Sequence, residues 1–417
     1  MSESESGKRS KYAASLGGCL PTREQELLLR AALLPGGDCS EAFSEWKTLA
    51  NLDHVDPGSY RLFPLLYKNL VANGIDDPYM NIFKWVYDVT LENNGRRFAA
   101  LSRLLVKLDE HGMEAALLKG TALAVEYYGD YGLRPMLDAD LLVPTRRARE
   151  AVEILTGLGW SSSITPLKGF SDMDALSRLG WEPEMRKLSE YSDEYFTVRH
   201  GQDLVNQDEF TIDLHWHVLH GYNPPDADAP FWEAARRVTV EGAPALVLDP
   251  ADQLLQVCAH GMRWDPTPPV RWVADAAVIL RKEGEGLDWG RLVAAARRHG
   301  VVLPVREALR YLASYPGMGV SEDALRELDA IPTGRAERFE YGVRTSPPGI
   351  KDGIVELGFL WSSYGKGNID SGFIRRLFGF PGFLTRVFGM GSVRHLAVYS
   401  GYELVRRTKE MAGLKRK

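Results

Sequence analysis

Two aspartates separated by a single residue, Asp138 and Asp140, come directly before a short apolar run at residues 141–143. A second apolar run lies upstream at residues 115–118, and each run has the length of a short buried strand. Between them, residues 121–128 are mostly good helix formers and are followed by a Gly-Asp stop. The chain is therefore expected to fold here as strand, helix and strand, with both carboxylates at the second strand.

Alternation along a strand places Asp138 and Asp140 on the same face. Two adjacent carboxylates repel each other unless positive charge lies between them, and Mg²⁺ prefers oxygen ligands and usually arrives with substrate phosphates. An acidic strand end without a ligand is the alternative, and a bare Asp-X-Asp pattern favours it. The residues upstream favour the metal. Gly120 lets a backbone approach a ligand closely, the helix start favours anions, and Thr121 adds a hydroxyl donor.

These residues resemble the nucleotidyltransferase superfamily that includes DNA polymerase β, and within it a bacterial family of uncharacterised nucleotidyltransferases. The matching runs are Leu118-Lys119-Gly120 and Arg134-Pro135-Met136-Leu137-Asp138-Ala139-Asp140-Leu141-Leu142-Val143. Gly-Thr here replaces the Gly-Ser or Gly-Gly that is more usual at the superfamily's loop, and it keeps the hydroxyl. The resemblance implies an α+β fold, in which a small mixed sheet is flanked by N- and C-terminal helical regions.

Strict alternation of apolar and polar residues predicts a half-buried strand at residues 209–218. Asp213, His215 and His217 fall on its polar face. The Asp-Leu-His-Trp run that begins at Asp213 is similar to one in the same uncharacterised family. The resemblance therefore implies that Asp213 is the third carboxylate of the site, beside Asp138 and Asp140.

The resemblance also implies a reaction, the transfer of NMP from an NTP to an acceptor with release of pyrophosphate. Asp138, Asp140 and Asp213 would be catalytic and would hold two Mg²⁺ or Mn²⁺ ions, which clamp the attacking and leaving oxygens. The residues expected to contact the nucleotide are Lys119, Gly120, Thr121, Arg134, His215, His260 and Asp275. Structural hydrogen bonds or ion pairs are the alternative for several of them, because buried polar residues usually pair within the protein. The acceptor stays open among a small molecule, a sugar, a peptide, a protein and an RNA.

Two other functions are compatible with parts of the sequence. His215 and His217, together with His260 and Asp275, follow the order of ligands in zinc-dependent hydrolases. Those hydrolases surround the site with a repeated strand–helix barrel, whereas helical patterns dominate both flanks here. The other alternative is a non-catalytic, nucleotide-binding regulator, and the three intact aspartates argue against it.

Length and composition set the boundaries of the prediction. A chain of 417 residues, 45% of them hydrophobic, can form two or three domains with cores. The net charge of −6 gives no general reason to expect a nucleic-acid partner. Three widely separated cysteines indicate a reducing cytoplasm, and neither a signal peptide nor a transmembrane segment is expected.

Hydrophobic patterns, together with what the family resemblance implies about the catalytic and cleft-closing regions, divide the chain into five expected regions. In chain order they are a disordered tail at 1–20, a helical region at 21–110, the catalytic domain at 111–250, a helical domain closing the nucleotide cleft at 251–345, and a basic aromatic segment at 346–417. Within the catalytic domain, residues 162–194 form an insertion that cannot be assigned, and residues 195–200 are expected to form a strand.

Helix-end signals are clear at three places. Thr22 with Gln25 predicts a capping box, Asp249 predicts an N-cap before proline, and Gly300 predicts a C-cap.

The C-terminal segment has a charge opposite to that of the whole chain. Between Lys366 and Lys417 there are eleven Lys or Arg and three Asp or Glu, with several phenylalanines among them. This composition is compatible with a membrane or nucleic-acid surface. Interruptions by Gly and Pro favour instead a packed tail with solvated arginines.

Overall fold

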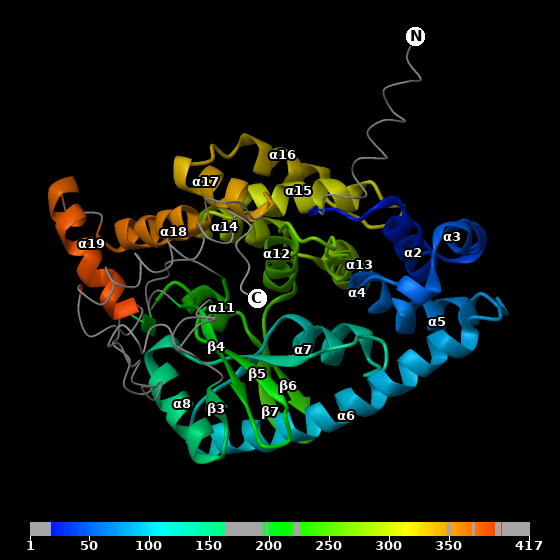
Figure 1. The fold of residues 1–417 in the computed structure, drawn as a ribbon, viewed down its shortest axis with the longest axis horizontal. Coiled ribbons are helices and arrows are strands. Elements are labelled where there is room, and N and C mark those ends of the chain that lie inside the picture. Colours follow the sequence, from blue (N-terminus) through cyan, green and yellow to red (C-terminus); the bar gives the residue numbers. More distant parts are fainter. Residues whose placement is uncertain are drawn as a thin grey trace, which may run out of the picture. The chain divides into compact units, whose positions relative to one another are not determined.

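The computed structural model describes residues 18–162, 195–196, 199–219, 226–347, 352–368, 372–387 and 393. The tail that is predicted to be disordered, apart from residues 18–20, and the unassigned insertion, apart from Ser162, therefore lie outside the described residues. The described residues form many helices and one mixed sheet (Figure 1). This confirms the predicted α+β class, in which helical regions come before and after the strands along the chain. The strand order of the sheet is β3 (Ser161–Ser162), β4 (Gly201–Val205), β5 (Thr211–His215), β2 (Asp138–Leu142), β1 (Ala116–Leu117), β7 (Ala243–Val247) and β6 (Arg236–Val240).

The chain divides into two compact units. One consists of Met1–Leu142 and Ala229–Asp352, and the other of Val143–Asp228 and Gly353–Lys417. The first boundary falls at the end of strand β2. The sequence-based division into five regions remains a prediction.

In the first unit, the predicted strand–helix–strand motif is present. Strand β1 (Ala116–Leu117) lies antiparallel to β2 (Asp138–Leu142) and parallel to β7 (Ala243–Val247), which continues the sheet to β6 (Arg236–Val240). Between β1 and β2 the chain forms α7 (Lys119–Leu123), which runs directly into the π-helical turn η2 (Ala124–Tyr128). Gly129 ends this turn with a φ of +63°, a backbone conformation that glycine adopts without steric cost.

The N-terminal helices pack around an aromatic core. They are α2 (Arg23–Leu33), α3 (Gly36–Leu49), η1 (Leu52–His54), α4 (Pro57–Tyr60), α5 (Phe63–Ala72) and the long α6 (Met80–Glu110). Trp46, Phe63 and Phe83 are almost fully buried, with ring centroids 4.8 to 6.2 Å apart. The predicted capping box at Thr22 is confirmed, and α6 extends alongside β6 and β7 (Figure 1).

The helices that follow β7 complete the first unit. They are α12 (Pro250–Gly261), α13 (Arg271–Glu283), η5 (Gly284–Gly286), α14 (Trp289–His299), α15 (Val302–Ala313), α16 (Glu322–Ala330) and α17 (Arg335–Arg344), and the short α11 (Ala229–Glu233) precedes β6. Asp249 caps α12 and Gly300 ends α14 in the left-handed conformation, so both predicted helix ends are confirmed. Almost every side chain of α12 is buried, which makes α12 a central helix of this unit.

The second unit contains η3 (Thr145–Arg147), α8 (Ala148–Gly157), β3 (Ser161–Ser162), β4 (Gly201–Val205), β5 (Thr211–His215), α18 (Asp352–Gly367) and α19 (Phe373–Val387). The expected strand at residues 195–200 is wrong. Tyr195 and Phe196 are helical, and the strand begins at Gly201 instead. The reason is that both aromatic rings pack on buried Trp216, with ring centroids 6.1 and 5.0 Å away. In the described parts of the chain, no helix combines the length and the apolar character needed to cross a bilayer.

Candidate functional site

The backbone of Asp140 is held at the junction of β1, α7 and β2. Its N–H donates to the Thr121 hydroxyl oxygen at 2.8 Å, and its carbonyl accepts from the Leu118 N–H at 3.1 Å. Thr121 is completely buried, so its hydroxyl connects α7 to β2 within the protein interior. The predicted contact of Thr121 with phosphate stays a prediction, while the structure shows its hydroxyl fixing the position of Asp140.

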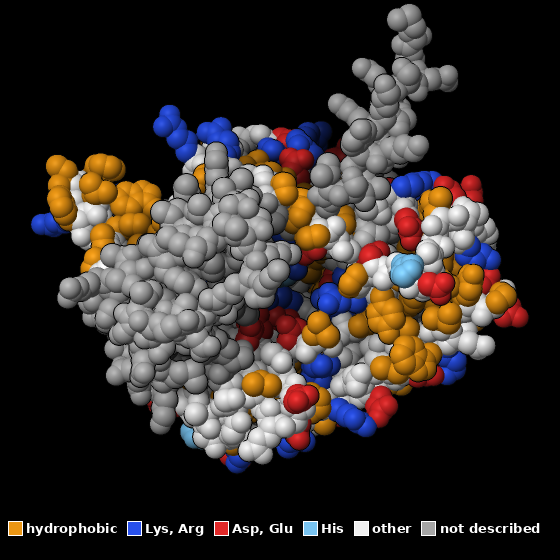
Figure 2. Space-filling view, viewed as in Figure 1, with side chains coloured by type: hydrophobic (Ala, Val, Ile, Leu, Met, Phe, Trp, Pro, Cys, Tyr) orange, Lys and Arg blue, Asp and Glu red, His pale blue; other side chains and the backbone are white. Residues whose placement is uncertain are grey.

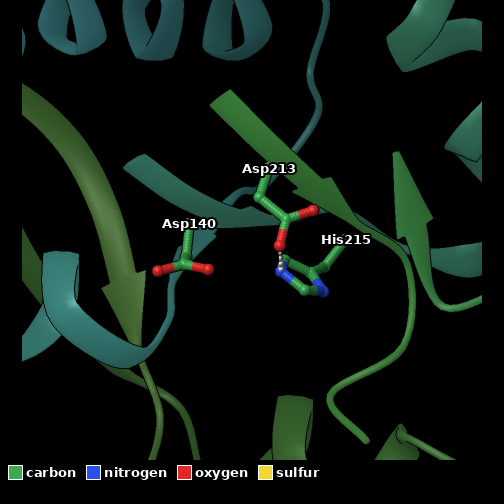
Figure 3. Close-up of side chains that lie close together, drawn as sticks. All are labelled: Asp140, Asp213 and His215. Carbon is green, nitrogen blue, oxygen red and sulfur yellow. Dashed lines mark ion pairs between the residues drawn. The ribbon is translucent and has the colours of Figure 1, made fainter. Parts of the chain in front are cut away.

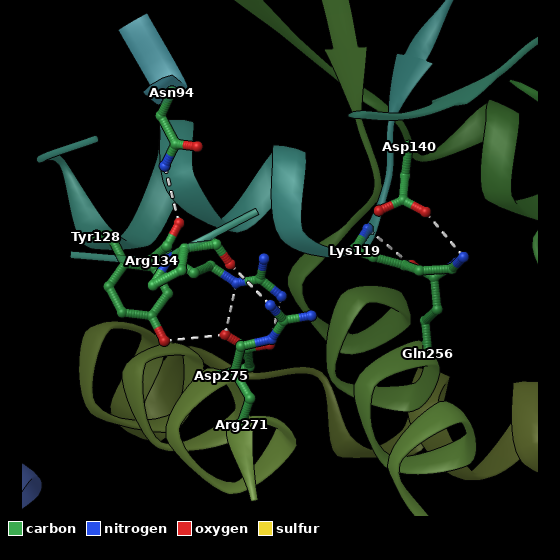
Figure 4. Close-up of polar contacts among 9 residues, drawn as sticks. Asn94, Lys119, Tyr128, Arg134, Asp140, Gln256, Arg271 and Asp275 are labelled. Atoms are coloured by element: carbon green, nitrogen blue, oxygen red, sulfur yellow. Dashed lines mark hydrogen bonds and ion pairs between the residues drawn. The ribbon is translucent and has the colours of Figure 1, made fainter. Parts of the chain in front are cut away.

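Lys119 supplies the positive charge that faces the Asp140 carboxylate. Its Nζ lies 2.8 Å from Asp140 Oδ1, with 18% of the Lys119 and 8% of the Asp140 side chain exposed (Figure 4). The Lys119 backbone has a φ of +43°, which is uncommon for a residue with a side chain and requires support from its surroundings. That support includes Gln256 of α12, whose Oε1 accepts the Lys119 N–H at 3.2 Å.

Gly120 makes room for a guanidinium group. A Cβ atom at Gly120 would lie 1.9 Å from Nη1 of Arg134, so no other residue fits while Arg134 keeps its place. Arg134 in turn donates from Nε and Nη2 to the two carboxylate oxygens of Asp275, at 2.9 and 2.7 Å. The Tyr128 hydroxyl donates to the same carboxylate at 2.9 Å (Figure 4).

Electrostatics stabilise this buried cluster in its charged form. Burial alone would raise the pKa of Asp275, but Arg134, Arg271 and the hydrogen bonds hold it below its usual value. Burial, with the nearby Arg134, lowers the pKa of Arg271 to about 10, so Arg271 still carries its charge at neutral pH. Arg271 also donates to the Pro135 carbonyl at 2.7 Å, which attaches α13 to the segment before β2.

His260 is a neutral side chain in a cationic environment. Burial, together with the positive charges of Lys119 and Arg263, lowers its pKa to about 3. The predicted nucleotide contacts Lys119, Arg134, His260 and Asp275 thus belong to the same unit as the Asp-X-Asp pair. Arg134 and Asp275 bind each other.

Asp138 has a basic neighbour that the sequence did not reveal. Burial lowers the pKa of Arg97 on α6, and the negative charge of Asp138 opposes that shift. Arg97 is held by the Asn94 side chain at 3.1 Å and by the Leu137 carbonyl at 3.2 Å. A positive side chain therefore accompanies each aspartate of the pair, Arg97 near Asp138 and Lys119 at Asp140.

In the second unit, β5 presents Asp213 and His215 on one face as predicted. His215 Nε2 lies 2.7 Å from Asp213 Oδ2, and His215 is completely buried (Figure 3). Gly201 of β4 lies opposite His215, where a Cβ would come within 3.2 Å of the ring. Asp203 lies directly opposite Asp213 in the same ladder, which places two carboxylates on one face of the sheet.

His217 pairs with a different aspartate from the one that pairs with His215. Its Nδ1 lies 2.5 Å from Asp228 Oδ2, and both side chains are buried. The other oxygen of Asp228 accepts the Val218 N–H at 3.1 Å. Asp228 therefore fixes the orientation of this imidazole at the end of β5.

One group of acidic and imidazole side chains has the spacing of metal ligands. Asp140, Asp213 and His215 each offer one ligand atom, and these atoms lie within 4.8 Å of one another (Figure 3). Among the described residues it is the one such group, and His217, His260 and Asp275 are outside it. The donors are mainly carboxylate oxygens, which suit Mg²⁺ or Mn²⁺, and His215 also bonds Asp213, as a partner that orients a ligand does.

Comparison with known proteins gives one family match. The family described as "Uncharacterised nucleotidyltransferase" matches residues 59–317, which is more than half of the chain. The match covers the Asp-X-Asp pair, Asp213 and the α12–α13 helices. Comparison with curated proteins finds no match.

Proposed function

We propose a reaction for this chain from the premise that it belongs to the uncharacterised nucleotidyltransferase family. The chain transfers NMP from an NTP to an acceptor and releases pyrophosphate. As the resemblance to the polymerase β superfamily implies, Asp138, Asp140 and Asp213 hold divalent metal ions in this reaction. The grouping of Asp140, Asp213 and His215 is the observation that carries the proposal.

The ligand set fits a hard divalent cation. Oxygen ligands predominate, and each carboxylate ligand has a further carboxylate nearby: Asp138 lies on the same strand as Asp140, and Asp203 of the neighbouring strand β4 lies opposite Asp213. Like charges at such spacing destabilise the sheet unless a cation lies among them. A bound Mg²⁺ or Mn²⁺ would supply Lewis-acid stabilisation of the phosphate and lower the pKa of the attacking hydroxyl.

The chain's own residues then have separate tasks. Lys119 and Arg134 provide positive charge for the triphosphate, Lys119 from a partly exposed ammonium and Arg134 from its Nη1, which faces Gly120. Thr121 keeps Asp140 in register, and His215 keeps Asp213 oriented. Asp213 favours the deprotonated acceptor, as a positioned carboxylate can.

Two alternatives have less support. A zinc hydrolase would need His215, His217, His260 and Asp275 together, but among the described residues His217, His260 and Asp275 lie outside the group with metal-ligand spacing, and Asp275 is bonded to Arg134. A non-catalytic regulator would need neither Asp213 nor its partner His215. The three cysteines are free, which supports the cytoplasm as the site of action.

Incubation of the protein with α-labelled NTPs and cell extract tests the proposal. Label should appear in a product with stoichiometric pyrophosphate when Mg²⁺ or Mn²⁺ is present, and EDTA should abolish it. Asp213→Asn should lower turnover by at least about a hundredfold, the scale expected for a positioned base. Asp208→Asn, an exposed turn residue of the same unit, is the matched control and should leave turnover unchanged. Transfer that survives EDTA would refute the proposal.

A further inference from the structure

Among the described residues, helix α19 packs on α18 mainly through its C-terminal half, although the Phe373 ring near its start also meets the Trp361 ring, with ring centroids 6.2 Å apart. Its C-terminal residues Phe383, Leu384 and Val387 form a buried cluster with Tyr364 of α18. The Phe383 and Tyr364 ring centroids are 4.8 Å apart. Gly379 permits this approach, because a Cβ there would lie 2.2 Å from the Tyr364 hydroxyl oxygen.

The N-terminal half of α19 presents large apolar side chains to solvent. Phe373 and Ile374 are each 70% exposed, Leu377 is 53% exposed and Phe378 is 81% exposed. Their spacing along the helix places them on one face. Figure 2 shows hydrophobic side chains at the left edge, where Figure 1 shows α19. Burying such a face in an apolar environment would be favourable.

Positive charge accompanies this apolar face. Arg375 and Arg386 are exposed and lie eleven positions apart, about three helical turns, so they share one side of α19. The residues from Lys366 to the end of the chain carry eleven Lys or Arg and three Asp or Glu, although the chain as a whole is acidic. An anionic partner therefore complements this segment.

We propose that the Phe373–Val387 helix docks on an anionic lipid surface, with Phe373, Ile374, Leu377 and Phe378 inserted among the acyl chains and the arginines at the headgroups. Amphipathic helices of this kind lie in the plane of the interface and need no spanning segment. Lipid fits better than nucleic acid, because Ile374 and Leu377 are aliphatic and cannot stack on bases. A second copy fits poorly, because four side chains make a face far smaller than a stable dimer interface.

Vesicle co-sedimentation of the full chain tests this inference. The protein should bind vesicles of phosphatidylcholine with phosphatidylglycerol and should bind pure phosphatidylcholine much more weakly. The double variant Phe373→Ser, Phe378→Ser should weaken binding at least about tenfold, because it removes most of the inserted apolar area. Arg375→Glu should weaken it roughly fivefold or more, since each arginine near an anionic surface contributes about that factor. The variant Trp85→Ser is the control, as Trp85 is a 59% exposed aromatic on α6 and should have no effect.

Three results would overturn the inference. The first is that the protein does not bind anionic vesicles, and the second is that the Trp85 variant loses as much vesicle binding as the double serine variant. The third is that RNA competes away vesicle binding while the double serine variant still binds RNA with the parent's affinity. A concentration-dependent dimer that the double serine variant dissolves, without vesicle binding by the parent, would assign the face to a second copy instead. The transferase assay serves as a check on folding, because every variant should retain the parent's activity on soluble substrates.

Discussion

Two ion pairs lie side by side in the first unit and differ in their geometry and in their exposure to solvent. Arg134 and Asp275 meet through two parallel hydrogen bonds, and Tyr128 adds a third donor to the carboxylate. Lys119 meets Asp140 through a single ammonium contact, and its side chain keeps 18% of its surface exposed. The first pair has the features of a structural connection between the β1–α7–β2 motif and α13. The second is suited to exchange one partner for a ligand.

A third carboxylate shows that neighbouring charges and hydrogen-bond donors decide how burial changes the pKa of a carboxylate. Asp252 on α12 is bonded through Oδ2 to Arg291, while its Oδ1 has no hydrogen-bond partner in the part of the chain that the structure describes. Burial raises the pKa of Asp252 to about 6, against the effect of Arg291. Asp275 is also buried, yet its pKa is lowered, because the positive charges of Arg134 and Arg271 and the hydrogen bonds from Arg134 and Tyr128 outweigh the effect of burial.

Breaking the structural pair should give the largest effect on stability. Arg134→Met leaves the charge of Asp275 buried without its main partner and should cost about 3–5 kcal/mol of unfolding free energy. Lys119→Met should cost clearly less, about 1–2 kcal/mol, because one hydrogen bond to a charged group is lost. Urea unfolding of both variants measures the difference. Equal losses would show that the two pairs do not differ as described.

The unsatisfied carboxylate should make stability depend on pH. Asp252 titrates near 3.8 in the unfolded chain and near 6 in the folded protein, so between these values the folded state holds a proton that the unfolded state has released. The stabilisation from protonated Asp252 is therefore complete below about pH 4 and is lost as the pH rises through 6, by roughly 2–3 kcal/mol at most. We expect the difference in unfolding free energy, parent minus Asp252→Asn, to fall as the pH rises from 4 to 7. A difference that stays constant would contradict the raised pKa.

Substitution of Gly120 should lower the stability of the protein, because the Arg134 guanidinium lies against this glycine. Gly120→Ala places a methyl group where the guanidinium lies and should cost about 1–3 kcal/mol, as overpacking does. In the Arg134→Met background the same change should cost much less, because the shorter, uncharged side chain can move away. A double-mutant cycle of unfolding free energies measures this coupling, and additive losses would show that another contact accounts for the glycine.

The smallest expected effect is on metal affinity, because Lys119 and a metal ion compete for the Asp140 carboxylate. In Lys119→Met no ammonium opposes a metal at Asp140, so Mn²⁺ should bind about fivefold more tightly in the absence of nucleotide, which corresponds to ~1 kcal/mol. The affinity for NTP with metal should fall in the same variant, because Lys119 no longer faces the phosphates. Calorimetric titrations of Mn²⁺ alone and of NTP with Mn²⁺ distinguish the two effects. Weaker Mn²⁺ binding without nucleotide would show that Lys119 supports the metal site rather than competing with it.

Much of the fold could be predicted from local patterns. The strand–helix–strand motif, the caps at Thr22, Asp249 and Gly300, and the polar face with Asp213 and His215 all follow from short-range rules of periodicity and capping. Such rules depend on neighbours within a few residues, and here packing agrees with them.

The partners within the site could not be predicted in this way. Arg134 and Asp275 are 141 positions apart, and Asn94, Arg97 and Gln256 come from helices with no motif of their own. Lys119 adopts a positive φ although nothing in its chemistry favours one, since only tertiary contacts impose it. The helical conformation of Tyr195 and Phe196 depends likewise on packing against Trp216.

Nucleotide binding with and without metal tests the central claim most directly. In calorimetric titrations the parent should bind NTP with Mg²⁺ at least about tenfold more tightly than in EDTA, because Asp138 and Asp140 repel an uncompensated triphosphate, and two phosphate–carboxylate repulsions of this kind exceed ~1.4 kcal/mol. In Asp140→Asn this dependence on metal should largely disappear. Equal affinity of the parent in Mg²⁺ and in EDTA would contradict the proposed metal-dependent transferase.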